Sequence, residues 1–322
     1  MKFFTAVTRS VTAGLLMALA GTAVAQQAYP NKPIRIIIPT GPGNANSLLA
    51  RMISQNLTER LGQPVVLENR PGANMIIGTT AVARAAPDGY TFLLASSTLA
   101  ALPSLLSSLP YDPIKDFDPI AAISKSQHVL LINPSVPANN VQELIAFAKS
   151  KPGQLNFASS GVGTAPHLAG ELFNIMTGTK IQHVPYTGAV YADLIGGQVQ
   201  MSFQNPIGAI PQIKSGKLKG LAITGDTRLE TLPQVPTFAE AGLPGFEMRG
   251  WYGLIAPAGT PKEIIGKMSS EMTAILLMPD LKEKLLVQGM EPFVLTPDQF
   301  AAMIKADMAR LAKIIKTANI KI

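Results

Sequence analysis

Two loops in this 322-residue chain combine glycines, small hydroxyl side chains and amides in a way that suits the binding of an anion. The first, Pro39–Ser47 (PTGPGNANS), and the second, Ala158–Pro166 (ASSGVGTAP), each follow an apolar run and precede an amphipathic segment. Such a loop can direct several backbone N–H groups at one point, and the start of the following helix adds a partial positive charge. Neither loop contains lysine, so the predicted site is neutral. Taken alone, each loop is equally consistent with an ordinary capped turn.

The sequence lacks the residue patterns of the common catalytic and cofactor sites. It has no cysteine, no G-x-S-x-G and no G-x-x-x-x-G-K-[ST] phosphate loop. The glycine pairs Gly41/Gly43 and Gly161/Gly163 lack the third glycine of a dinucleotide-binding turn. Three histidines are too few for a histidine-rich metal site. We therefore predict no catalysis, no metal and no cofactor.

Each histidine stands alone in the sequence. His128 and His183 border predicted strands, where a structural role is the simpler interpretation. His167 falls in the first turn of a predicted helix, so its ring either faces the second loop or packs in the core.

The elements that position these loops alternate between short apolar runs and amphipathic helices, which indicates an α/β architecture. The predicted strands are Ile34–Pro39, Val65–Leu67, Thr91–Ala95, Val129–Asn133, Leu155–Ala158, Ile181–Val184, Met201–Phe203 and Leu218–Thr224. Predicted helices are a segment from Asn46/Ser47 to Leu61, then Val141–Lys149, Pro166–Thr177, Ile207–Ser215, Pro261–Leu277 and Pro297–Lys316. Asn140 and Glu143 have the spacing of a capping box, so Asn140 is predicted to cap the helix that begins at Val141. The uncharged stretch between Asp88 and Asp112 is interrupted by Pro103 and several serines, so it predicts a buried strand and a short helix instead of a membrane span.

Composition and charge narrow the range of possible functions further. Hydrophobic residues make up 47% and charged residues 15% of the chain, which excludes a disordered protein. The net charge of +7 is spread out and accompanied by few aromatic residues, so no nucleic-acid partner is expected. Residues Met1–Ala25 have the basic start, apolar core and small-residue Ala23–Ala25 end of a secretory signal peptide, and their removal takes the net charge to +5. We predict an exported protein that is not inserted in the membrane.

An ordered series of short phrases extends over essentially the whole mature chain. They are Tyr29–Arg35 (YPNKPIR), Glu68–Ala73 (ENRPGA), Pro87–Thr91 (PDGYT), Leu109–Asp112 (LPYD), Lys115–Phe117 (KDF), Glu143–Ile145 (ELI), His183–Tyr186 (HVPY), Gly196–Val199 (GGQV), Val235–Thr237 (VPT) and Ala256–Pro261 (APAGTP). With this series the chain closely resembles the Bug family, the periplasmic solute receptors of tripartite tricarboxylate transporters.

The resemblance implies a two-lobed periplasmic-binding-protein fold that closes on a carboxylate. Lobe one is then expected at residues 26–124 and 250–322, and lobe two at 125–249. The implied role is to capture a dicarboxylate or aromatic carboxylate and deliver it, as a monomer, to the transporter's membrane subunits. The predicted ligand-binding residues are Thr40, Gly43, Asn44, Ala45, Asn46, Ser47, Asn74, Ser96, Ser159, Ser160, Gly163, Thr164, His167, Tyr186 and Asn205.

The sequence departs from the family's pattern at three places in the expected cleft. Asn44 follows Pro42-Gly43 where a further glycine is usual, and Ser47 stands where the family has aspartate. Asn74-Met75 replaces a glycine pair, and Asp193 comes about two residues early after Tyr186. These departures concern the identity of the ligand more than the fold. Two other functions stay open. The protein could present its ligand to a sensor kinase, or it could be a secreted enzyme that acts on a carboxylate.

Overall fold

The computed structural model describes residues 29–42, 45–186, 190–246 and 248–320 of the chain. The chain divides into an N-terminal unit, residues 1–31, and a second unit, residues 32–322, which contains every helix and strand described below. The predicted signal peptide, residues 1–25, lies outside the described residues. Within the described ranges, no helix is both long enough and apolar enough to cross a membrane.

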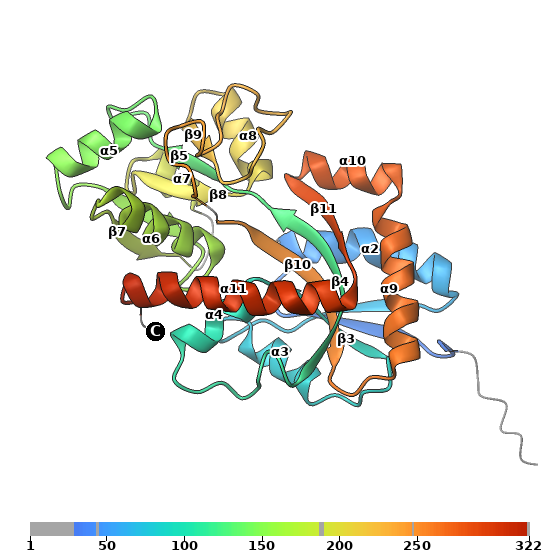
Figure 1. Ribbon diagram of the computed structural model, residues 1–322. Coiled ribbons are helices and arrows are strands. Elements are labelled where there is room, and N and C mark those ends of the chain that lie inside the picture. Colours follow the sequence, from blue (N-terminus) through green and yellow to red (C-terminus); the bar gives the residue numbers. More distant parts are fainter. Residues whose placement is uncertain (1–28, 43–44, 187–189, 247, 321–322) are drawn as a thin grey trace, which may run out of the picture. The chain divides into compact units, whose positions relative to one another are not determined.

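The second unit contains two β-sheets with helices packed on them, which confirms the predicted α/β class (Figure 1). The six-stranded sheet has the order β11-β4-β10-β3-β1-β2 and the five-stranded sheet the order β7-β6-β8-β5-β9. The first contains β1 (Ile34–Ile38), β2 (Val65–Asn69), β3 (Thr91–Ser96), β4 (Phe117–Ser126), β10 (Gly250–Pro257) and β11 (Met290–Leu295). The second contains β5 (Val129–Ile132), β6 (Asn156–Ser159), β7 (Gln182–Pro185), β8 (Met201–Gln204) and β9 (Lys219–Ile223).

The helices connect and cover these strands. They are α2 (Ala45–Leu61), α3 (Ile76–Ala83), α4 (Thr98–Leu105), α5 (Val141–Ser150), α6 (Ala165–Thr177), α7 (Tyr191–Ile195), α8 (Pro206–Lys214), α9 (Lys262–Leu276), α10 (Pro279–Val287) and α11 (Pro297–Thr317). The Asn140 side chain accepts a hydrogen bond from the Glu143 N–H and so caps α5, as the sequence predicted. A full capping box between Thr296 and Gln299 begins α11.

Strand order brings the loops that follow the parallel strands to one edge of each sheet. In the six-stranded sheet β1 is parallel to both β2 and β3, so the three strands end at the same edge. In the five-stranded sheet β6 is parallel to both β7 and β8, with the same result. Loops that follow the carboxyl ends of neighbouring parallel strands surround a common crevice. The chain passes from the first sheet to the second between Ser126 and Val129, and it returns between Ile223 and Gly250.

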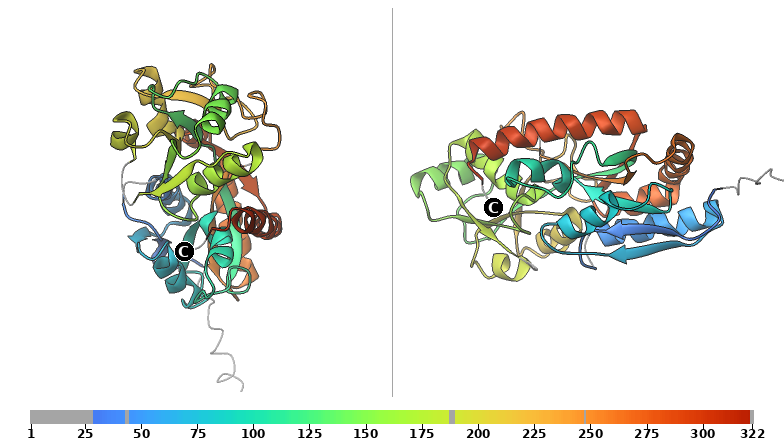
Figure 2. Two further views of the ribbon diagram at one scale, coloured as in Figure 1. Left: turned by 90° about the vertical axis from the view of Figure 1, so that its left-hand side faces the viewer. Right: turned by 90° about the horizontal axis from the view of Figure 1, so that it is seen from below.

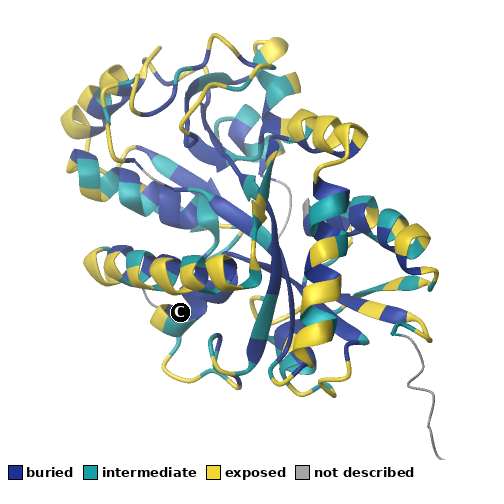
Figure 3. Cartoon of the chain, turned by 45° about the vertical axis from the view of Figure 1, so that its right-hand side comes forward, coloured by how far each residue is buried: buried dark blue, intermediate teal, exposed yellow. Residues whose placement is uncertain are grey.

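A continuous apolar core joins the two sheets. One cluster of buried residues includes Leu93 and Ile255 of the six-stranded sheet together with Phe157 and Phe203 of the five-stranded sheet. Helix α11 contacts both α4 and α6, and Figure 2 shows it lying along one side of the six-stranded sheet, away from α2. The central strands are buried along their length, whereas the helices turn exposed residues outward (Figure 3).

Most predicted elements are present, and the missed strands each contain a residue that disfavours a strand interior. The stretch after Asp88 forms the predicted buried strand, β3, and short helix, α4. Strands β4 and β11 were not predicted, because Pro119 and Pro292 lie within them and proline disfavours a strand interior. Strand β10 was not assigned either, since Gly253 interrupts its apolar run. These three strands are antiparallel neighbours at one side of the six-stranded sheet.

Candidate ligand-binding site

The first predicted loop is closed by a residue from the neighbouring strand. Ile38 and Asn69 are paired at the carboxyl ends of β1 and β2. The Asn69 amide donates to the Thr40 carbonyl oxygen at 2.8 Å and to the Ser47 Oγ at 3.1 Å. The Ser47 hydroxyl in turn donates to the Gly41 carbonyl oxygen at 3.1 Å. Thr40 and Ser47 therefore lie together at the sheet edge, and Asn69, which sequence reasoning did not assign, holds them there.

The start of α2 contributes a buried side-chain NH2 group that has no acceptor among the described residues. Asn46 is 4% exposed, and its Nδ2 forms no hydrogen bond with any described residue. A buried amide without an acceptor is costly unless a ligand or water supplies one. Of the other predicted residues here, Ala45 begins α2, while Gly43 and Asn44 lie outside the described residues.

The turn before α3 places Met75 beside Ser96 at the same edge. Ser96 ends β3 and is almost fully buried. Its hydroxyl contacts the Met75 Sδ at 3.5 Å. The predicted Asn74, next to Met75, is exposed and has a left-handed backbone with φ of 51°. Sequence reasoning noted Met75 as a departure from the family but gave it no role.

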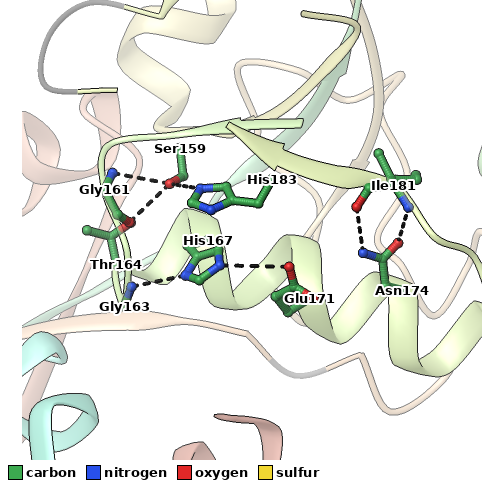
Figure 4. Close-up of polar contacts among 9 residues, drawn as sticks. All are labelled: Ser159, Gly161, Gly163, Thr164, His167, Glu171, Asn174, Ile181 and His183. Carbon is green, nitrogen blue, oxygen red and sulfur yellow. Dashed lines mark hydrogen bonds and ion pairs between the residues drawn. The ribbon is translucent and has the colours of Figure 1, made fainter. Parts of the chain in front are cut away.

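The second predicted loop is held by two stacked histidines (Figure 4). The rings of His167 and His183 lie 3.8 Å apart, centroid to centroid. The Gly163 N–H donates to His167 Nδ1 at 3.0 Å, so the proton of His167 is on Nε2, which faces the Glu171 carboxylate at 3.8 Å. The His167 ring therefore faces the second loop, one of the two alternatives that the sequence left open.

The hydroxyls of this loop are largely occupied within it. The Ser159 Oγ lies 3.0 Å from the Gly161 carbonyl oxygen and 2.7 Å from His183 Nε2, and it is within hydrogen-bond distance of both. The same Oγ accepts from the Gly161 N–H at 3.1 Å, and the Thr164 hydroxyl donates to the Gly161 oxygen at 2.7 Å. Ser160, by contrast, is exposed. Ser159, Gly163 and Thr164 thus shape the loop, and Ser160 presents a hydroxyl at its surface.

Burial keeps the two histidines uncharged. Desolvation, followed by the neighbouring His183, lowers the pKa of His167 from 6.5 to about 3. Desolvation lowers the pKa of His183 to about 4. Both rings are therefore neutral near pH 7, and they contribute hydrogen bonds and no positive charge to this edge.

Two further predicted residues follow the neighbouring strands of the five-stranded sheet. Tyr186 comes after β7, and its hydroxyl donates to the Asp193 Oδ2 at 2.8 Å, which raises the pKa of Tyr186 above its ordinary value. Asn205 comes after β8 and immediately precedes α8. Its Oδ1 is buried and accepts no hydrogen bond from the described residues. Asn46 lies at the start of α2, the helix that follows the six-stranded sheet's β1, and Asn205 lies just after the five-stranded sheet's β8. Among the described residues, Asn46 Nδ2 lacks an acceptor and Asn205 Oδ1 lacks a donor.

The carboxyl edges of the two sheets approach each other. Ser97, next to Ser96, lines one small space together with Gly163, Ala165 and Arg249. A Cβ at Gly163 would collide with the Leu105 side chain of α4. A second close approach joins Pro206, the first residue of α8, and Gly289, which lies between α10 and β11. Loops from both sheets therefore meet, as a shared site requires.

Arg249 brings a positive charge that sequence reasoning did not place here. It lies on the segment that returns to the six-stranded sheet just before β10, and it pairs with Asp226. Burial lowers the pKa of Arg249, although not enough to discharge a guanidinium near pH 7. No signal in the sequence links this arginine to either loop, because 85 residues separate it from Thr164.

A groove larger than the small space beside Gly163 lies elsewhere. It has a volume of about 830 Å³ and is lined by the starts of α9 and α11 and by the first residues of β4. Phe117 pairs with Pro257, whereas Ser96 pairs with Tyr252 at the other end of β10. The groove is therefore at the opposite edge of the six-stranded sheet, and no predicted site residue lines it. Among the described residues there is also no cluster of three or more His, Asp or Glu that could hold a metal ion.

The fold and its paired loop edges define a two-sheet α/β binding protein, and comparison with known proteins identifies the family. Residues 49–320 match the tripartite tricarboxylate transporter family receptor. The protein BugT of Bordetella pertussis is 37% identical over 315 residues, which cover 96% of this chain and 97% of BugT. This chain therefore belongs to the family of tripartite tricarboxylate transporter receptors, and the predicted resemblance to the Bug proteins is confirmed.

Solved structures agree in fold over nearly the whole chain. Rpa4515 of R. palustris, solved with adipate, has a TM-score of 0.83 and 34% identity, and the match covers 91% of this chain and 100% of that one. MatC of Rhodopseudomonas palustris, solved with bound malate, has a TM-score of 0.79 and 30% identity, with 89% and 100% covered. Both relatives were solved with dicarboxylates.

Proposed function

We propose that this receptor captures a small organic dicarboxylate between its two loop edges and delivers it to the membrane subunits of its transporter. The observation that carries the proposal is the meeting of the two carboxyl edges, one of which presents the buried Asn46 Nδ2 donor without an acceptor among the described residues. Asn46 Nδ2 can donate to a carboxylate, and the start of α2 adds its partial charge. The relatives solved with adipate and malate support the same ligand class.

The division into lobes follows from the same proposal. Lobe one comprises residues 26–124 and 250–322, and lobe two residues 125–249. The two sheets support this division, because each contains strands from only one of the proposed lobes except for the last two residues of β4. Closure of the lobes on the ligand would create the surface that a membrane subunit recognises.

We further propose that the receptor works in the periplasm as a monomer, after cleavage of residues 1–25, and that it leaves its ligand chemically unchanged. Membership of a receptor family supports a binding role.

Calorimetry with a matched pair of ligands tests the proposal. Adipate should bind, and its monoamide should bind several hundredfold more weakly, because losing one carboxylate removes about two charge-assisted hydrogen bonds of roughly 1.5–3 kcal/mol each. The same comparison is made with succinate and its monoamide. Recovery of the acid unchanged by NMR after incubation checks for catalysis. Equal affinity for the diacid and the monoamide would contradict a site that holds both ends.

A further inference from the structure

The turn that precedes α3 has an unusual backbone. Ala73, Asn74 and Met75 are consecutive non-glycine residues with positive φ, of 44°, 51° and 74°. The Ile76 N–H donates to the Ala73 carbonyl oxygen at 3.0 Å and closes the turn. Residues with side chains adopt left-handed backbone singly and seldom in series, since the Cβ crowds the following carbonyl.

The packing around the turn fixes this conformation. Gly78 of α3 lies so close to the first loop that a Cβ there would be 2.9 Å from Pro39 Cα and 2.8 Å from the Arg70 carbonyl oxygen. The helix is thereby pressed against the end of β1, and the turn has to reverse the chain in the few residues between Arg70 and α3. The position of Met75 is set by the main chain on both sides of it.

Glycine would adopt this left-handed backbone conformation without strain, whereas methionine adopts it only with steric strain from its Cβ. Asparagine tolerates left-handed backbone because its short polar side chain can bond locally, whereas a thioether offers no such compensation. Strained residues persist where the surrounding structure holds them, and they concentrate at functional sites. The φ of 74° at Met75 therefore points to a role for its side chain.

The contact between the Met75 side chain and Ser96 indicates the role of Met75. Met75 Sδ accepts the Ser96 hydroxyl at 3.5 Å, at the carboxyl edge where Asn69 and Ser47 also meet. Sulfur is a weak acceptor, and a thioether donates no hydrogen bond. A ligand carboxylate can take the Ser96 hydroxyl away from sulfur at little cost. A ligand hydroxyl placed against Met75 would instead lose its water and gain no strong partner.

We propose that Met75 determines ligand selectivity by placing an apolar thioether against the carbon segment of the bound acid, so that the receptor prefers unsubstituted acids over hydroxylated ones. The inference rests on the proposed dicarboxylate-binding function and adds the chemical class of the segment between the carboxylates. A methylene chain or an aromatic ring meets this requirement, since thioethers pack well against both.

Calorimetry with two pairs of acids tests the inference. Succinate is compared with tartrate, and adipate with mucate, its tetrahydroxylated counterpart, so that within each pair only hydroxyl groups differ. The protein should bind the unsubstituted member about tenfold more tightly. Met75→Gln, of similar length but polar, should reduce this ratio at least fivefold, whereas the apolar Met75→Leu should retain it. Met176→Gln, the same change near the far end of α6, is the matched control and should leave the ratio unchanged.

Met75→Gly keeps the test decisive if a bulky variant folds poorly. Glycine relieves the left-handed strain, so the melting temperature of the Met75→Gly protein should not fall, while its preference for unsubstituted acids should be lost. An unchanged ratio in both Met75→Gln and Met75→Gly, with an unsubstituted acid still bound, would overturn the role of Met75 and leave the proposed function standing. Failure of all four acids to bind the unaltered protein would overturn the proposed function and this inference together.

Discussion

Acidification between pH 7.5 and 5 should destabilise this protein through its histidines. The chain contains only three, and burial depresses the pKa of each, to about 4 for His128, about 3 for His167 and about 4 for His183. In the unfolded chain a histidine takes up its proton near pH 6.5. Below that pH the unfolded state binds more protons than the native state, so the free energy of unfolding falls until the native pKa is reached. Above pH 7.5 the contribution is constant.

The expected loss is about 2 kcal/mol for each fully buried histidine between pH 7.5 and 5. His128 and His167 are 5% and 3% exposed, so together they account for about 4 kcal/mol. His183 is less completely buried and adds a smaller amount. The ordinary pKa of a carboxyl group, about 4, lies below this range, so histidine is the side chain that ordinarily titrates within it. Glu171 acts in the opposite direction, because burial raises its pKa and the native state then binds a proton before the unfolded state does.

Urea unfolding at a series of pH values measures this dependence. His128→Gln and His167→Gln should each lose about 2 kcal/mol less than the unaltered protein on acidification, whatever their stability at pH 7.5. Ser202→Ala is the matched control, because it removes a buried hydroxyl bond to the Ala158 carbonyl oxygen without removing a proton site. Glu171→Gln removes the opposing contribution of Glu171, so the free energy of unfolding of this variant should fall more on acidification than that of the unaltered protein. A free energy of unfolding that is equal at pH 7.5 and 5 would refute the neutral, buried state of these rings.

Three further predictions concern the site and the core. Ser47→Asp should weaken binding of a dicarboxylate by about 1–3 kcal/mol through like-charge repulsion, measured by calorimetry against Ser54→Asp on the same helix, which should bind normally. Small-angle scattering should give a smaller radius of gyration at ligand saturation, and identical curves would argue against lobe closure. Gly170→Ala should destabilise the protein by about 1–3 kcal/mol, because the new Cβ would overlap the Phe157 ring. The same change at Gly266, where the space is open, should be neutral or slightly stabilising, and equal effects at both positions would contradict the packing argument.

The sequence by itself was sufficient for features that depend on neighbouring residues. The apolar run at Ile34–Ile38 predicted a buried strand, and four of its five residues are buried. Asn140 and Glu143 predicted the start of α5 from their spacing alone. Both glycine-rich loops were also found in this way. Periodicity, capping and turn chemistry operate over a few residues, so a single sequence carries them directly.

The tertiary structure decided which distant residues meet, and with it the chemistry of the site. The stacking of His167 on His183 depends on β6 and β7 being parallel neighbours, with α6 following β6. The contact of Met75 with Ser96, the bonds from Asn69 to the first loop and the arrival of Arg249 depend on strand order and on the returning segment before β10. The sequence predicted neutral loops with free donors. The structure shows that His167 engages the Gly163 N–H and that the Gly161 N–H and the Thr164 hydroxyl bond within the loop, because a buried polar group requires a partner wherever the fold supplies one.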